Sequence, residues 1–149
     1  MVCLGNICRS SMAEGILQAK LPAGFEVDSV GTISQHEGEA PDSRAIKTAK
    51  AHGVDISAQR SRPVTKEDIS NSDRVYCMDL NCYEDVISMA ENETERKKIS
   101  LFLQAAGNSG DEIEVPDPYW GGEEEFEAVF QMLDTATDKI AADLTAKNI

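Results

Sequence analysis

Residues 1–15 read MVCLGNICRSSMAEG, and this stretch decides the fold that the sequence predicts. Residues 1–3 have the apolar character of a strand end, and apolar side chains recur at helical spacing over residues 11–21. Ser11 and Glu14 have the spacing of a capping box, which predicts that the helix begins at Ser11. Residues 3–10 therefore form a loop that leads from a strand into a helix.

The rest of the chain alternates strand-like and helix-like segments. Strands are predicted at residues 25–31, 74–78 and 99–103, and helices at residues 42–52, 81–90 and from 123 onward. The prolines and glycines of residues 115–122 predict a loop. Such alternation is typical of an α/β fold in which helices flank a parallel sheet. Ligands of these folds bind at the carboxyl ends of the strands, which is the place that residues 3–10 occupy.

Length, charge and cysteine content limit the class of protein. The chain has 149 residues, which suits a single domain spanning residues 1–149. Its formal net charge of −13 is unfavourable for binding nucleic acid or an anionic membrane. It has no apolar run that could span a bilayer and no signal-peptide pattern, so we expect a cytoplasmic protein. The cysteines are then expected to be thiols, and they lack the spacing of a zinc site: Cys3, Cys8, Cys77 and Cys82.

The loop after the first strand has the composition of an anion-binding site. Gly5 and Asn6 tolerate backbone conformations that other residues resist, and a helix N-terminus presents free backbone N–H groups. Arg9 adds a planar fork of donors that matches phosphate. The same positive field stabilises a thiolate, to which Ser10 can donate a hydrogen bond. We therefore predict that Cys3 is a nucleophile directed at the phosphorus of a phosphate monoester.

A second segment supplies the candidate general acid. Expulsion of a phenolate needs a proton, and Asp117 is the best-placed carboxyl group to give it. Pro116 and Pro118 flank Asp117 and stiffen the loop. Tyr119 and Trp120 follow at once, and their aromatic surface suits a flat leaving group such as a phosphotyrosine ring.

The segments CLGNICRS (residues 3–10) and DPYW (residues 117–120) together resemble those of the low-molecular-weight protein tyrosine phosphatases. The likeness covers nearly the whole chain. It implies an α/β three-layer sandwich, with a four-stranded parallel sheet flanked by helices on both faces. It also implies a phosphotyrosine protein phosphatase that uses no metal and no cofactor. The expected substrates are phosphotyrosine proteins or small aryl phosphates, the product is inorganic phosphate, and we expect a monomer.

The resemblance also implies roles for individual residues. Cys3 forms a phosphocysteine, while Asp117 acts first as acid and then as base for the hydrolytic water. The phosphate is held by Arg9 and the loop, which comprises Leu4, Gly5, Asn6, Ile7, Cys8, Arg9 and Ser10. Asn6 and Ser29 brace that loop, and Ser10 tunes the thiolate. Cys8 matches a thiol that can form a reversible disulfide with the nucleophile, although it can equally be a packing residue.

The chain departs from the family pattern at three places. Only two residues precede Cys3, where the family usually has several, so the first strand is expected to be short or its start trimmed. Gln35 occupies a pocket-wall position that is often aromatic. Its neighbour His36 either lines the rim of the pocket or is a solvated loop residue, and we favour the second interpretation. Gln59 stands where many members have a bracing histidine.

Three alternative functions remain open. A thiol-dependent arsenate reductase of the same fold needs a relay of cysteines on a mobile segment, whereas Cys77 and Cys82 are predicted to be core residues. A protein-arginine phosphatase of this fold carries Thr where this chain has Ile7. A non-catalytic phosphate-binding module would need neither Cys3 nor Asp117.

Overall fold

A single parallel sheet forms the centre of the molecule. The computed structural model describes residues 1–146. Its four strands are β1 (Val2–Cys3), β2 (Val30–Gly31), β3 (Val75–Cys77) and β4 (Ile99–Leu101). The strand order is β2-β1-β3-β4 and every pairing is parallel, with Val2 opposite both Val30 and Cys77. The four-stranded parallel sheet that the resemblance implied is confirmed, and the strand that leads into residues 4–8 lies inside it.

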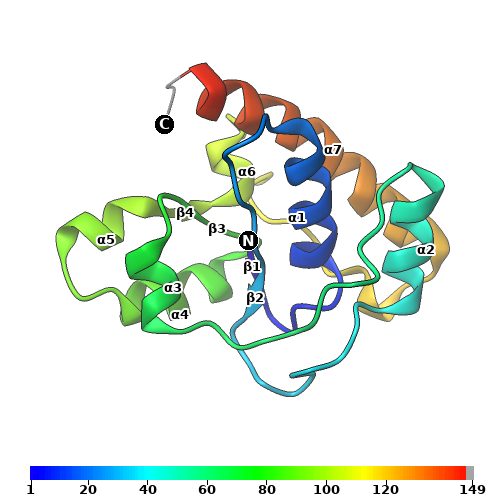
Figure 1. The fold of residues 1–149 in the computed structure, drawn as a ribbon, viewed down its shortest axis with the longest axis horizontal. Coiled ribbons are helices and arrows are strands. Elements are labelled where there is room, and N and C mark those ends of the chain that lie inside the picture. The colour runs from blue at the N-terminus through cyan, green and yellow to red at the C-terminus, as the bar shows by residue number, and fades with distance from the viewer. Residues whose placement is uncertain (147–149) are drawn as a thin grey trace.

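Helices cover both faces of the sheet (Figure 1). They are α1 (Arg9–Lys20), α2 (Ser43–Ala51), α3 (Lys66–Asn71), α4 (Leu80–Met89), α5 (Glu93–Lys98), α6 (Phe102–Ala105) and α7 (Glu123–Ala146), with a 3₁₀ helix η1 (Pro118–Trp120). Helices α1, α2 and α7 pack together on one face, and α3 and α4 lie on the other. The three-layer arrangement is therefore confirmed.

The apolar stripes of the helices fill two cores. On one face, Met12 and Ile16 of α1 are buried together with Phe126, Phe130 and Leu133 of α7. On the other face a smaller cluster joins the sheet to Ile69 of α3 and Val86 of α4. Burial of each such side chain contributes about 1.5–3 kcal/mol. The two cores fix α1 and the sheet relative to each other, and so fix the loop between them.

The first helix begins earlier than the sequence predicted. Its first residue is Arg9 and its N-cap is Cys8, so the capping box predicted at Ser11 and Glu14 is wrong. The reason is that the Met12 N–H already donates to the Cys8 carbonyl (3.0 Å), which closes a helical turn inside the loop. Ser11 Oγ instead donates to the Asn6 carbonyl (3.1 Å), and Glu14 accepts from Ser29 Oγ (2.7 Å).

Other boundaries also differ from the prediction. Of residues 25–31 only Val30 and Gly31 form a strand, because the residues before them run past the start of β1 and have no ladder partner. The strand predicted at residues 99–103 stops at Leu101, where α6 begins. The predicted loop at residues 115–122 contains η1, which Pro118 can begin because the first helical position needs no N–H donor. Helices α3 and α5 were not predicted.

The remaining elements match the prediction closely. Asp42 caps α2, which ends beside His52, and α4 and β3 fall within a residue of the predicted limits. The long helix from Glu123 is α7, and three glutamates in its first turn favour the positive end of the helix dipole. No helix among residues 1–146 is long and apolar enough to cross a membrane.

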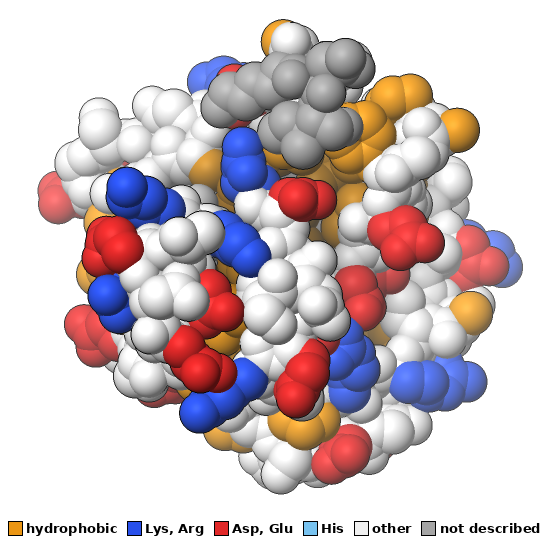
Figure 2. Space-filling model, turned by 60° about the vertical axis from the view of Figure 1, so that its left-hand side comes forward, with side chains coloured by type: hydrophobic (Ala, Val, Ile, Leu, Met, Phe, Trp, Pro, Cys, Tyr) orange, Lys and Arg blue, Asp and Glu red, His pale blue; other side chains and the backbone are white. Residues whose placement is uncertain are grey.

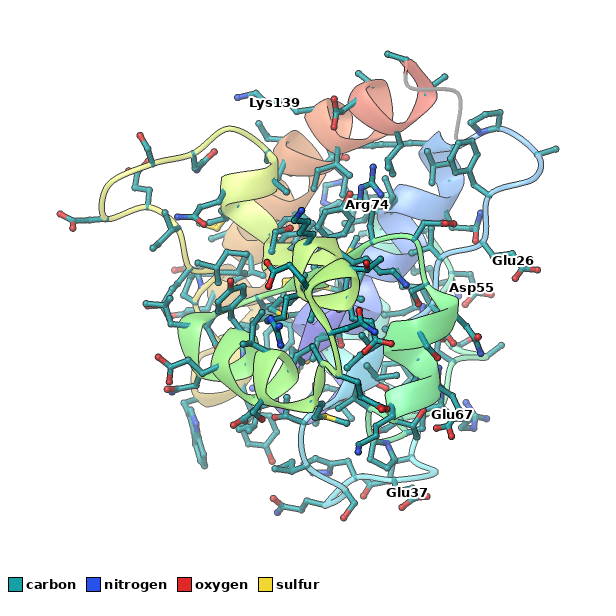
Figure 3. All side chains as sticks on the ribbon, turned by 90° about the vertical axis from the view of Figure 1, so that its left-hand side faces the viewer. Glu26, Glu37, Asp55, Glu67, Arg74 and Lys139 are labelled. Carbon is teal, nitrogen blue, oxygen red and sulfur yellow. The ribbon has the colours of Figure 1, made fainter. Side chains whose placement is uncertain are left out.

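Charged side chains cover the outside of the fold. On the face shown in Figure 2, Asp and Glu side chains are interspersed with Lys and Arg. Figure 3 shows Glu26, Glu67 and Lys139 pointing outward from the fold. Because the chain carries a net charge of −13, any positive site for an anionic ligand has to be local.

Candidate active site

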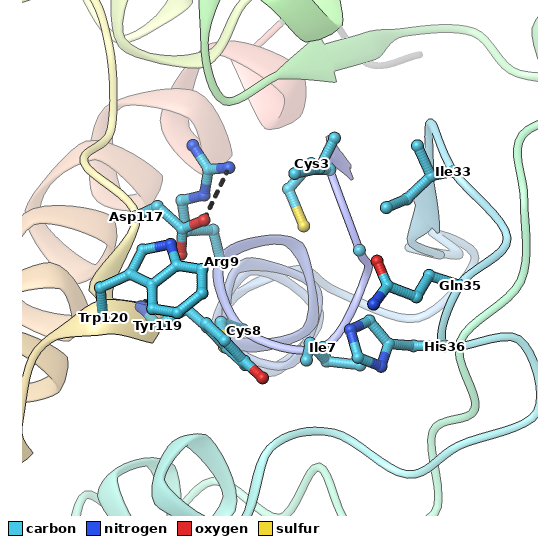
Figure 4. A pocket seen from close by; sticks show the side chains of 12 residues that line it. Cys3, Ile7, Cys8, Arg9, Ile33, Gln35, His36, Asp117, Tyr119 and Trp120 are labelled. Carbon is cyan, nitrogen blue, oxygen red and sulfur yellow. Dashed lines mark hydrogen bonds and ion pairs between the residues drawn. The ribbon is translucent and has the colours of Figure 1, made fainter.

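A cavity of about 160 Å³ opens where the chain leaves β1 and enters α1. We call residues 3–9 the phosphate loop and residues 117–121 the acid loop. Cys3 lies at the base of the cavity, between the acid-loop residues Asp117, Tyr119 and Trp120 on one side and Gln35 and His36 on the other (Figure 4). The structure thus brings together the two segments that the sequence singled out at opposite ends of the chain.

The Cys3 thiol is buried and surrounded by hydrogen-bonding groups. Its side chain sits at the N-terminal end of the twelve-residue helix α1. Cys3 Sγ lies 3.0 Å from Ser10 Oγ, and the Asn6 N–H donates to the sulfur over 3.3 Å. Hydrogen bonds and the positive end of a helix dipole both favour the anionic form of sulfur.

Asn6 holds the phosphate loop in its curved shape. Its φ angle is 56°, in the left-handed region that asparagine tolerates better than most residues. Asn6 Nδ2 donates to Ser10 Oγ and to Ser29 Oγ, both over 2.9 Å. Asn6 Oδ1 accepts from the Arg62 N–H over 3.1 Å. One side chain therefore ties the loop to α1, to the start of β2 and to the segment after α2.

Ser29 extends this network to a half-buried acid. Ser29 Oγ accepts from Asn6 and donates to Glu14 Oε1 (2.7 Å). Burial raises the pKa of Glu14, and the hydrogen bond from Ser29 offsets only part of that rise. Gln59 braces the first turn of α1, because its Nε2 donates to the Ser11 carbonyl (3.0 Å). Within the described residues its Oε1 has no hydrogen-bond partner.

Two further residues contact the backbone of the phosphate loop, and neither of them was identified from the sequence. A Cβ atom on Gly31 would lie 2.9 Å from the Leu4 carbonyl oxygen and 3.2 Å from Asn6 Cβ, so only glycine fits beneath the loop. Ser61 Oγ donates to the Gly5 carbonyl over 2.9 Å. A glycine in a strand can mark the close approach of another backbone, which is the one signal that could have found Gly31.

Arg9 is almost fully buried and is fixed on the side of the acid loop. Its Nη1 donates to Asp79 Oδ2 (2.8 Å) and to the Val115 carbonyl (2.9 Å). Its Nη2 lies 3.7 Å from Asp117 Oδ2. Burial raises the pKa of Asp79, but hydrogen bonds from the Cys82 N–H and from Arg9 outweigh it and leave that pKa below its usual range. Asp79 therefore stays ionised and orients the guanidinium. No role was predicted for this residue from the sequence.

Asp117 is held at the mouth of the cavity. Its Oδ1 accepts from the Tyr119 N–H (3.0 Å), which makes it the N-cap of η1, while its Oδ2 faces Arg9. The Tyr119 and Trp120 rings meet edge to face, with centroids 4.9 Å apart. Trp120 is 86% exposed, so it forms a lip of the cavity more than a wall.

The opposite side of the cavity combines two polar side chains with the apolar Ile33. Gln35 and His36 line it, so of the two interpretations of His36 the structure favours the pocket rim. The His36 ring lies above Gly5, with its Nδ1 3.3 Å from both oxygens of Glu39. Its centroid is 6.5 Å from that of Tyr119. A flat ring entering the cavity would therefore meet aromatic surface on one side and hydrogen-bonding groups on the other.

The other three cysteines differ from Cys3 in their surroundings. Cys8 lines the cavity, but burial and the neighbouring Asp42 raise the pKa of its thiol. Cys77 in β3 and Cys82 in α4 are buried in the smaller core, as predicted. Burial raises the pKa of Cys77 to about 12. Among residues 1–146 there is no cluster of His, Cys, Asp and Glu side chains that could hold a metal ion.

Comparison with known proteins shows which family the chain resembles. Residues 1–148 match the model of the family described as low molecular weight phosphotyrosine protein phosphatase. The human protein of that name is 33% identical over 87% of this chain and 84% of its own length. A crystal structure of a protein tyrosine phosphatase from Entamoeba histolytica has 35% identity and a TM-score of 0.90, covering 99% of this chain and 96% of its own. Vibrio vulnificus Wzb in complex with benzylphosphonate has 33% identity and a TM-score of 0.85, with 96% and 95% covered.

Proposed function

Since the chain belongs to the low molecular weight phosphotyrosine protein phosphatases and is an enzyme of that class, we propose that Cys3 is its nucleophile and Asp117 its general acid and base. One observation carries the proposal. The Cys3 sulfur lies at the N-terminus of α1, hydrogen-bonded to Ser10 Oγ and the Asn6 N–H, in the cavity that Asp117 also lines. The proposed nucleophile, the anion-binding loop and the proposed proton donor thus line the same cavity.

In the first step the Cys3 thiolate attacks phosphorus. An S–P bond forms while the P–O bond to the aryl group breaks, and the protonated Asp117 carboxyl gives its proton to the departing oxygen. Arg9 and the backbone N–H groups of residues 4–9 stabilise the charge on the three remaining oxygens. The fixed bond from Arg9 to Asp79 means that this stabilisation needs no rearrangement during the reaction.

In the second step Asp117, now a carboxylate, takes a proton from water. The water oxygen attacks phosphorus, the S–P bond breaks, and the products are inorganic phosphate and the Cys3 thiolate. Asp117 regains its proton in this step, so the acid is ready for the next substrate. Charge neutralisation comes entirely from Arg9 and the loop, and the proposed scheme uses no metal or cofactor.

The shape of the cavity supports aryl phosphates, including small ones, as substrates. Tyr119 and Trp120 offer aromatic surface beside Asp117, and Gln35 faces them. Benzylphosphonate, the ligand in the Vibrio vulnificus Wzb structure, also joins an aromatic ring to a phosphonate group. Arsenate reduction is not favoured, because Cys77 and Cys82 are buried in the core and cannot serve as a mobile relay.

Several further assignments are part of the proposal. Cys8 lines the same cavity as Cys3, and we propose that an oxidant such as hydrogen peroxide removes two electrons and two protons from the pair to form a disulfide. Four free cysteines support a reducing compartment, the cytoplasm. We also propose that residues 1–149 act as one domain and as a monomer, which size-exclusion chromatography with light scattering tests.

The test is hydrolysis of p-nitrophenyl phosphate by the parent, Cys3→Ser, Asp117→Ala and, as a matched loss of a thiol, Cys77→Ala. We expect Cys3→Ser to abolish turnover. Asp117→Ala should lower turnover by about 10²–10⁴-fold, which is the usual contribution of a general acid. Cys77→Ala, folded as judged by circular dichroism, should stay active. Persistent activity in Cys3→Ser would refute the proposed nucleophile.

A further inference from the structure

Arg44, at the start of α2, reaches across to the acid loop. Its Nη1 donates to the Gly121 carbonyl (2.8 Å) and its Nη2 to the Tyr119 carbonyl (3.0 Å). Its guanidinium carbon lies 4.6 Å from the Phe126 ring centroid and 5.6 Å from that of Tyr119. Arg44 therefore holds the backbone at Tyr119 within η1 and at Gly121 just after it, and its guanidinium lies over the face of the Tyr119 ring.

Asp42 anchors the same guanidinium from the other side. Asp42 Oδ1 accepts from Arg44 Nε and Oδ2 from Arg44 Nη2, both over 3.0 Å. These hydrogen bonds lower the pKa of Asp42, so the pair is charged at neutral pH. The Asp42 backbone N–H also donates to the Ile7 carbonyl of the phosphate loop over 2.8 Å. A continuous chain of contacts thus runs from Ile7 through Asp42 and Arg44 to Tyr119 and Gly121.

We propose that Asp42 and Arg44 are positioning residues that set the place of Asp117 relative to the phosphate loop, an inference that rests on the proposed role of Asp117 as general acid. The acid must lie within hydrogen-bond reach of the leaving oxygen at the moment the P–O bond breaks. A misplacement of about 1 Å can cost about 10²-fold in rate. The Asp42–Arg44 pair joins the loop that fixes phosphorus to the loop that carries the acid.

The geometry requires an arginine at this position. Four acceptor atoms surround its guanidinium: both oxygens of Asp42 and the carbonyls of Tyr119 and Gly121. A planar fork of five N–H groups can satisfy them together, whereas a lysine ammonium is a single point charge with three donors. Arg44→Lys should therefore restore only part of the function lost in Arg44→Ala.

The experiment compares two substrates that differ in their need for an acid. The tyrosine leaving group has a pKa of about 10 and needs protonation, while the nitro group of p-nitrophenol makes it a better leaving group. We expect Arg44→Ala to lower kcat/KM for phosphotyrosine about 10–100-fold, and that for p-nitrophenyl phosphate several-fold less. Asp42→Asn keeps a good N-cap for α2 and should shift both values in the same direction by a smaller factor.

A double-mutant cycle separates positioning from general structural damage. In the Asp117→Ala background there is no acid to position, so adding Arg44→Ala should lower kcat/KM by less than about twofold. The matched control is Lys47→Ala, on the same helix, whose exposed ammonium lies 2.6 Å from Glu123 Oε1 on α7. It removes a cationic contact between α2 and α7 without touching the acid loop, and should leave both substrates unaffected.

Distinct results overturn the inference. Equal losses on both substrates, or a further large loss in the Asp117→Ala background, would show that Arg44 acts on the fold or on phosphate binding. An Asp117-dependent activity that survives Arg44→Ala would overturn the inference alone. An Asp117→Ala variant as active as the parent on phosphotyrosine would overturn the role of Asp117 together with the inference.

Discussion

Replacing Gly31 by alanine should damage the phosphate loop more than it damages the fold. Gly31 lies in β2 directly under the loop, and a methyl group there would meet the Leu4 carbonyl oxygen at 2.9 Å and the Gly5 carbonyl carbon at 3.2 Å. The strand cannot retreat, because the Gly31 N–H donates to Arg62 (2.9 Å) and its carbonyl accepts from Val64 (2.8 Å). The loop must therefore move.

The size of the effect follows from these distances. Comfortable contacts between heavy atoms are about 3.5–4.0 Å, so the loop backbone has to shift by several tenths of an ångström. Overpacking of this kind lowers the free energy of unfolding by about 1–3 kcal/mol. Alanine also reduces the conformational entropy of the unfolded chain relative to glycine, which offsets about 0.4–1 kcal/mol of that loss. We expect a net destabilisation of about 1–2 kcal/mol. A shift of about half an ångström in the groups that hold the phosphate should lower kcat/KM about tenfold.

Two measurements test the prediction side by side. Urea denaturation gives the free energy of unfolding, and p-nitrophenyl phosphate hydrolysis gives kcat/KM. The control is Gly15→Ala in α1, where the new methyl group would lie 2.6 Å from Ile56 Cγ2 and 2.8 Å from Val54 Cγ1, away from the loop. That variant should also lose stability but keep kcat/KM within about twofold of the parent. Full activity in Gly31→Ala, or an equal loss of kcat/KM in Gly31→Ala and Gly15→Ala, would refute the reasoning.

Three further predictions concern the residues that surround the loop. Asn6→Ala removes the hydrogen-bond partners of Ser10, Ser29 and the Arg62 N–H. The free energy of unfolding should fall by about 1–3 kcal/mol, because these donors and acceptors are left unsatisfied. An unchanged midpoint of urea denaturation would contradict this. Asp79→Asn removes the charge that fixes Arg9, so inorganic phosphate should inhibit it more weakly than the parent, as competitive inhibition constants would show. The lowered pKa of Asp79 adds stability that is complete above the usual carboxyl pKa of about 3.9 and disappears as the pH falls through the lowered value. The thermal midpoints of the parent and Asp79→Asn should therefore differ most near pH 7 and converge in strong acid. A difference in thermal midpoint that stays constant with pH would contradict the lowered pKa.

The features that the sequence predicted well are those with strong local signals. Helix α7 keeps apolar spacing over many turns, and α2 has an aspartate cap and a glycine stop. The boundary errors came from contacts between distant segments. Strand β2 is short because its length depends on where β1 offers partners, and α1 starts early because the phosphate loop itself supplies its first acceptor.

The site shows the same division. Cys3, Arg9 and Ser10 lie within eight consecutive residues, so one segment revealed them. Arg44 has the pattern of an ordinary charge on a helix surface, and nothing near it in the sequence points to the carbonyls that it holds. Gly31 resembles any glycine at the end of a strand. Their roles depend on atoms 25 to 77 residues away along the chain, which local patterns do not encode.

Three aspartates show how local and distant roles are combined in one side chain. Asp42, Asp79 and Asp117 each cap a helix with Oδ1, and the Oδ2 of each faces an arginine: Arg44 at 3.0 Å, Arg9 at 2.8 Å and Arg9 at 3.7 Å. The cap is local and readable in sequence. The contact with Arg9 is tertiary for Asp79 and Asp117, whereas Asp42 contacts an arginine only two residues further along the chain. Because a folded cap already fixes the carboxylate, its second oxygen can orient a guanidinium at little further entropic cost. Substituting asparagine keeps the first role and weakens the second, so the Asp→Asn variants of Asp42 and Asp79 separate helix capping from the organisation of the site.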